Sequence, residues 1–143
     1  MRVTQYVHFA AFSSELTAAE IEKRVGVIPD EVLVRGSKDP ERPLPIQHMW
    51  AVSSQQRELS LYEQVAEVLS RIAPIEAALT DLLPRIGDGG YVLQIVRHLN
   101  DPDAPETKTL ALGFGFERAH LQLLDRLSAR IDVDEYDYSL GDE

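Results

Sequence analysis

The sequence contains no cysteine, few aromatic residues and no long hydrophobic run. Without cysteine the chain forms no disulfide, no thiolate nucleophile and no cysteine-ligated zinc site. Its apolar runs are far shorter than the roughly 20 residues of a membrane-spanning helix, so we expect no membrane span. The opening stretch MRVTQYVHFAAFSSE has one early arginine, and His8 interrupts its apolar run. We therefore predict no secretory signal and expect a bacterial, cytoplasmic protein.

Basic residues are also scarce. The 143 residues include 24 Asp and Glu but only 14 Lys and Arg, which gives a formal net charge of -10. A field of that sign repels phosphate backbones, because nucleic-acid binding depends on lysine and arginine displacing counterions. Nucleic acid is therefore not expected as a partner. The same field favours a basic protein partner, although a need for solubility alone would also explain it.

What the sequence does contain is the composition of one globular domain, with 44% hydrophobic and 27% charged residues. We expect a single domain over 1–143. In the first part of the chain, Thr17 and Glu20 have the spacing of a helix capping box, and Gly26 can end that helix in a left-handed conformation. The patterns predict strands over 3–12, 31–36 and 46–54, a helix over 17–25, and a proline-rich irregular segment over 37–45.

A second capping box, Ser60 with Glu63, precedes the strongest pattern in the sequence. Apolar residues recur in steps of three and four, which is the period of an amphipathic helix. Pro74 lies inside this stripe without disturbing its phase, so we predict a kinked helix that ends at Gly87. The stripe consists of Leu61, Val65, Val68, Ile72, Ile75, Leu79, Leu82 and Ile86.

The remaining sequence predicts two strands, a helix and a last strand. The strands cover 91–99 and 108–116, and the helix covers 117–129 with His120 or Leu121, Leu124 and Leu127 buried. The resulting order is β-α-β-β-α-β-β-α-β. Units of this kind predict an α+β fold of ferredoxin-like character, with a mostly antiparallel sheet of about six strands and the helices packed on one face.

Five stretches resemble a bacterial family, domain of unknown function 4279, and the resemblance extends over nearly the whole chain. They are YVHFAAF, VGVIPDE, Arg35-Gly36, MWAVSS and LDRLSARIDVDEY. The last strand of the family alternates apolar residues with Asp and ends in Tyr, as in Ile131, Asp132, Val133, Asp134 and Tyr136. Glu135 departs from an apolar position and Glu117 from a Ser or Thr helix cap. The resemblance implies a shared fold and no particular activity.

Histidines and aspartates are the candidate metal ligands. His8, His48 and His98 all lie on predicted strands, and they could meet if those strands are neighbours with matching faces. Their spacing has no ligand signature, so separate structural histidines are the competing interpretation. Asp132 and Asp134 lie on one face of the last strand, about 6.5 to 7 Å apart at a rise of about 3.3 Å per residue, and could share a cation.

A second set of residues could bind a small ligand. If the first and last strands pair, Tyr6 could border a groove together with Tyr136 and Tyr138, and Arg35 followed by Gly36 could admit an anionic group. Trp50 is the fifth candidate of this set. Ordinary core packing is the alternative for all five residues.

The last strand also poses a question of register. Ile131 and Val133 share one face with Glu135, so a regular strand turns acidic on the side where it began apolar. Either the core ends after Val133, or a bulge near Asp134 reverses the alternation.

The sequence has no catalytic signature, which favours a non-enzymatic protein-interaction module of a regulatory or toxin-neutralising type, binding a basic protein. The alternative is a domain that binds a small ligand or a metal in a groove lined by Tyr and His, with or without catalysis. No cofactor is predicted, and the protein is expected as a monomer or a homodimer.

Overall fold

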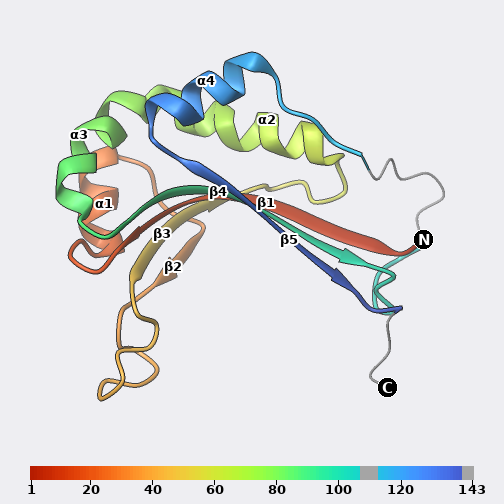
Figure 1. Cartoon of the computed structure of the whole chain (residues 1–143), viewed down its shortest axis with the longest axis horizontal. Coiled ribbons are helices and arrows are strands. Elements are labelled where there is room, and N and C mark those ends of the chain that lie inside the picture. The colour runs from red at the N-terminus through yellow and green to blue at the C-terminus, as the bar shows by residue number, and fades with distance from the viewer. Residues whose placement is uncertain (107–112, 140–143) are drawn as a thin grey trace.

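A computed structural model describes residues 1–106 and 113–139. Five strands form one sheet in the order β2-β3-β1-β4-β5, and the helices lie on one of its faces (Figure 1). The elements in chain order are β1 (Val3–Ser13), α1 (Ala18–Val25), β2 (Glu31–Leu33), β3 (His48–Ser53), α2 (Leu61–Ile72), a 3-10 turn η1 (Ala73–Ile75), α3 (Glu76–Ile86), β4 (Gly89–Leu99), α4 (Arg118–Arg126) and β5 (Arg130–Asp137).

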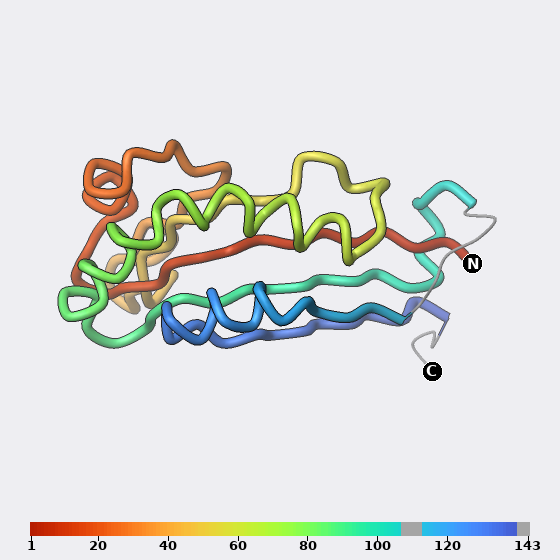
Figure 2. Tube along the Cα trace, turned by 90° about the horizontal axis from the view of Figure 1, so that it is seen from above, coloured from red at the N-terminus to blue at the C-terminus, as the bar shows by residue number. Residues whose placement is uncertain are grey.

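The α+β class is confirmed and the described sheet is mostly antiparallel as predicted, but it has five strands in place of about six, and its order differs from the prediction. Strand β1 lies at the centre and is antiparallel to both β3 and β4, whereas β5 runs parallel to β4. The sheet is therefore mixed, and its order is not ferredoxin-like. Strand β5 is parallel because α4 precedes it, and a crossover helix returns the chain to the end from which β4 started (Figure 2).

A sixth strand over 108–116 was expected. Residues 108–112 lie outside the described part of the chain, and 113–116 form no strand. Phe114 and Phe116 instead pack against the core just before α4. The predicted strand over 31–36 is also shorter, because β2 ends at Leu33.

Local signals in the sequence placed the helices correctly. Thr17 and Ser60 each accept a hydrogen bond from the backbone of the third helical residue and complete the two predicted capping boxes. Gly26 ends α1 in the left-handed conformation. The kink predicted at Pro74 is present as η1, which separates α2 from α3. In α4, however, the buried face contains Leu123 in place of the expected His120 or Leu121.

The main core fills the space between the helices and one face of the sheet. Alternate residues of β1, namely Val7, Phe9 and Ala11, point into this core together with Leu93 and Ile95 of β4. Helix α2 lies along β1, and α1 packs against β3. The opposite face of the sheet carries no helix (Figure 1), so no helix separates its side chains from other molecules.

Candidate functional site

The helix-free face is defined by the strand register. Because Val7 and Phe9 point into the core, Thr4, Tyr6 and His8 between and before them point the other way. The register places His98, Val96 and Gln94 of β4 opposite these three residues. It also places Tyr136, Asp134 and Asp132 of β5 beside them. We call this surface the helix-free face.

One end of the helix-free face is apolar. Ala10, Met49, Ala51 and Val92 form a small buried cluster, against which Phe12 and Leu33 pack. No helix covers these side chains, which are buried by packing against one another and against Phe12 and Leu33. The apolar cluster therefore borders the polar part of the same face.

A chain of polar contacts crosses the helix-free face from β2 to β5. His8 Nε2 lies 2.6 Å from Gln94 Oε1, and Gln94 Nε2 donates to Asp134 Oδ2 at 2.8 Å. Because the Gln94 amide nitrogen is directed at Asp134, its oxygen is an acceptor for His8, so His8 Nε2 carries the proton. His8 Nδ1 lies 3.6 Å from Glu31 Oε2 and makes no hydrogen bond within the described residues.

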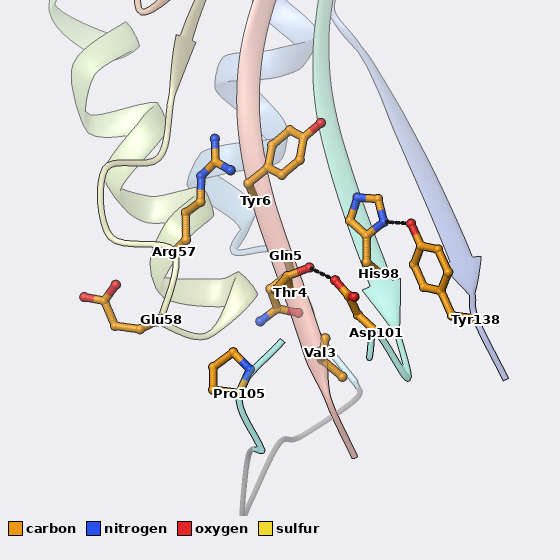
Figure 3. A pocket seen from close by; sticks show the side chains of 10 residues that line it. All are labelled: Val3, Thr4, Gln5, Tyr6, Arg57, Glu58, His98, Asp101, Pro105 and Tyr138. Carbon is orange, nitrogen blue, oxygen red and sulfur yellow. Dashed lines mark hydrogen bonds between the residues drawn. The ribbon is translucent and has the colours of Figure 1, made fainter. Parts of the chain in front are cut away.

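A groove of about 480 Å³ opens at the other end of the face (Figure 3). The groove brings together side chains from β1, β4, the end of β5 and two loops. They are Val3, Thr4, Gln5, Tyr6, Arg57, Glu58, His98, Asp101, Pro105 and Tyr138. This volume is within the range of about 300 to 1,000 Å³ that is typical of ligand sites.

Stacked rings form one wall of the groove. The His98 ring lies 5.2 Å from the Tyr136 ring and 5.8 Å from the Tyr138 ring, with nearly parallel planes in both pairs. His98 Nδ1 is 3.0 Å from the Tyr138 hydroxyl. About half the surface of each tyrosine is exposed, at 52% for Tyr136 and 50% for Tyr138. The wall is thus both aromatic and accessible.

Charged groups line the rest of the groove. The Arg57 guanidinium lies over the Tyr6 ring, 4.6 Å from its centroid, which is a cation–π contact. Asp101 accepts a hydrogen bond from the Thr4 hydroxyl at 3.3 Å. Burial raises the pKa of Tyr6, and the charge of Glu31 raises it further against the opposing effect of Arg57. Tyr6 is therefore protonated at neutral pH.

The structure brings some of the predicted ligand-binding residues together. Tyr6 and Tyr138 line the groove, and Tyr136 adjoins it through His98. The first and last strands are not paired as the prediction assumed, because β4 lies between them. Trp50 is absent from the groove: it is fully buried in the core, where its Nε1 donates to the Val27 carbonyl at 3.1 Å. Arg35 is exposed on the turn after β2.

The predicted metal ligands do not converge. His98 is paired with Thr4, four residues from His8, a separation of roughly 13 Å at about 3.3 Å per residue. His48 lies at the far end of β3, where its Nδ1 accepts from the Arg35 backbone at 3.1 Å. In the described part of the chain, no three His, Asp or Glu side chains are grouped as a metal site requires.

The two aspartates of β5 have partners of their own. Arg130 Nε lies 3.3 Å from Asp132 Oδ2, and Gln94 donates to Asp134. Strand β5 pairs with β4 without interruption from Arg130 to Asp137, so it has no bulge. Ile131 packs against the core but Val133 is 40% exposed, so the core ends before Val133. The prediction that the core ends within this strand, after Val133, is therefore close to the structure, in which the core ends after Ile131.

Sequence reasoning did not identify Gln94, Arg57 or Gln64 as parts of the site. Gln94 had a signal, because it is the one uncharged polar residue inside the apolar run of its strand. Gln64 is fully buried and holds the loop that carries Arg57. Neither residue is marked by a motif, since their importance depends on contacts between distant segments.

The sequence profile of the family described as domain of unknown function DUF4279 matches residues 3–138. Neither the curated proteins nor the solved structures include a match to the chain. In the described residues, no helix is long and apolar enough to cross a membrane.

Proposed function

We propose that this chain, which belongs to the DUF4279 family, is a non-enzymatic module that binds a basic segment of another protein on its helix-free face. The observation that carries the proposal is the combination of accessible aromatic rings and carboxylates at the groove. Exposed Tyr136 and Tyr138 flank His98. Asp101 lies beside His98 and Tyr138, and Glu58 lies on the other side of the groove (Figure 3).

This combination suits a lysine or arginine side chain. Tyrosine rings attract cations through their negative faces, and nearby carboxylates neutralise the charge. The Arg57 contact with Tyr6 is an internal example of the same interaction. Tyrosine is also enriched at protein interfaces, because it offers a large apolar area and a polar tip.

The surrounding charge supports the same partner. Asp132 and Asp134 extend the acidic surface along β5, and the one cation beside them among the described contacts, Arg130, is paired with Asp132. The chain as a whole carries a formal charge of -10. Such a field speeds association with a basic surface and weakens at high salt. Regulation or neutralisation of a basic toxin is one form that this function can take.

The test uses two acetylated peptides of equal length, hexa-arginine and hexa-glutamate, with affinity measured by isothermal titration at low and high salt. Hexa-arginine should bind, more weakly at high salt, and hexa-glutamate should not. NMR spectra should place the largest ring-proton shifts at His98 and Tyr138. If hexa-arginine does not bind, or shifts only signals of the helix layer, the proposal is wrong.

A pair of double variants separates a site from mere net charge. Asp132→Asn with Asp134→Asn removes two charges from the helix-free face. Asp81→Asn with Asp125→Asn removes two from exposed positions on α3 and α4. At roughly 0.5 kcal/mol for each exposed charge contact, the first pair should weaken hexa-arginine binding about five-fold. Equal weakening by both pairs would mean that the peptide senses only total charge.

The same groove also supports a second candidate function, the binding of a small metabolite, because its volume of about 480 Å³ is that of a ligand site. A thermal-shift screen with metabolites and divalent cations distinguishes the two. A ligand that binds the native state raises the melting temperature, and a flat profile across the screen removes this candidate.

A further inference from the structure

Exposed apolar side chains are concentrated in the ribbon around β2. Ile28 is 78% exposed and Ile46 is 66% exposed, and Val32, Val34 and Leu44 are about half exposed. We call these five residues the β2 surface. Single exposed apolar residues are common on proteins, but a group of them in one segment marks a contact surface.

The β2 surface belongs to one continuous ribbon. Beyond β2, the Gly36 backbone donates to the Pro45 carbonyl at 3.0 Å, and the Lys38 backbone donates to the Leu44 carbonyl at 2.9 Å. The two arms leading from β2 and into β3 therefore lie side by side and bring Val34 near Ile46. Figure 1 shows this ribbon projecting from the sheet, away from the helices.

The two edge strands of the sheet, β2 and β5, differ in how strongly charge protects them from pairing with another strand. An edge strand offers unpaired backbone groups to any second strand, and proteins commonly protect such edges with charge. Edge strand β5 is protected in this way by Asp132, Asp134, Glu135 and Asp137. Edge strand β2 has Val32 at its centre, 48% exposed. Only β2 is therefore suited to accept a strand.

We propose that β2 pairs with β2 of a second copy of this chain, antiparallel and with Val32 at the two-fold axis, to form a continuous sheet of ten strands. The charge of this segment favours a second copy as the partner. The segment 28–46 contains four carboxylates and three cationic side chains, a formal charge of -1, whereas the whole chain carries -10. The β2 ribbon is thus the part of the molecule where two acidic copies can approach with the least repulsion.

The charges along the strand are also self-complementary. Glu31 precedes Val32 and Arg35 follows it. Pairing about Val32 places each Leu33 opposite Glu31 of the other copy. The turn that carries Arg35 follows Leu33 and would therefore lie beside the start of the other copy's β2, where Glu31 is. A parallel arrangement would instead bring like charges together.

The interface is small, because β2 has three residues. Contacts below about 1,200 Å² are typical of transient association, so the dimer should form in proportion to protein concentration. Salt screens the repulsion between two acidic copies and should favour the dimer. Binding of a basic peptide on the helix-free face should respond to salt in the opposite direction, so the two proposals fail independently.

The absence of cysteine permits a direct test by cross-linking. Directly opposed residues of an antiparallel pair have Cα atoms about 4.5 to 5.5 Å apart, which is within the range of about 4.4 to 6.8 Å for a disulfide. Val32→Cys should therefore form a disulfide-linked dimer in a glutathione redox buffer. Val133→Cys is the matched control, a valine of similar exposure (40%) on the other edge strand.

Sedimentation velocity tests the unmodified protein. The parent chain should show a dimer fraction that rises with protein concentration and with salt, and Val32→Lys should remain monomeric with an unchanged circular dichroism spectrum. A parent that is monomeric at every concentration and salt overturns the proposal. Cross-linking of Val133→Cys at least as fast as Val32→Cys overturns it too, because β5 or chance collision would then be the contact.

Discussion

Replacing Gln64 with leucine should loosen the loop that forms one side of the groove. Gln64 is fully buried in α2. Its Oε1 accepts from the Ser54 hydroxyl at 2.6 Å, and its Nε2 donates to the carbonyls of Arg57 at 3.1 Å and Leu59 at 2.9 Å. Leucine keeps the approximate volume and removes all of these hydrogen bonds.

The expected loss follows from those contacts. At about 1 kcal/mol net for each of three good hydrogen bonds, Gln64→Leu should lower the free energy of unfolding by about 3 kcal/mol. With a urea dependence of about 2 kcal/mol per molar, the midpoint of urea unfolding should fall by about 1.5 M. Equilibrium unfolding followed by circular dichroism measures this shift.

Gln122→Leu on the exposed side of α4 is the matched control. Substitutions at such surface positions change stability by less than about 0.5 kcal/mol. Gln64→Leu should also weaken hexa-arginine binding, because the loop that positions the Glu58 carboxylate at the groove is released. If Gln64→Leu unfolds within about 0.5 kcal/mol of the parent, the Gln64 network does not stabilise the loop and the reasoning is refuted.

Two further outcomes test the ionisation of Asp30 and the glycines at the start of β4. Burial opposes ionisation of Asp30, but hydrogen bonds from the Ser53 backbone and from Arg71 outweigh it and keep its pKa below the ordinary value. The ionised Asp30 therefore stabilises the fold above about pH 4, and this stability is lost as pH falls through the lowered pKa. Asp30→Asn should thus reduce the loss of stability at acid pH when the free energy of unfolding is measured against pH. An unchanged acid dependence would contradict this. A Cβ at Gly89 would lie 2.3 Å from the Phe12 carbonyl oxygen, whereas one at Gly90 meets nothing within 4 Å, although both residues have positive φ. Gly89→Ala should thus destabilise clearly more than Gly90→Ala in urea unfolding, and equal losses would show that φ alone matters.

The two proposals use different surfaces and are compatible. Pairing through β2 would leave the groove open, because none of the residues that line the groove belongs to β2. A dimer would present two such grooves on one continuous sheet. Two linked sites raise the apparent affinity for a partner that carries two basic segments.

The sequence was sufficient for features that depend on near neighbours in the chain. Both capping boxes, the left-handed Gly26 and the break at Pro74 follow from a few adjacent residues, and the structure contains each of them. The resemblance to the DUF4279 family is confirmed in the same way, because a profile compares residues position by position. Two-residue periodicity also assigned Asp132, Asp134 and Tyr136 to one face of the last strand.

Only the tertiary structure decided which strands are neighbours, and therefore which side chains meet at the candidate site. Periodicity states which side chains share a face of one strand, but strand pairing depends on packing between segments far apart in the chain. Placing β4 between β1 and β5 set His98 beside Tyr136 and separated His8 from the other histidines. The predicted metal cluster therefore did not assemble, while Tyr6, Tyr138 and the unpredicted Arg57 met at one groove.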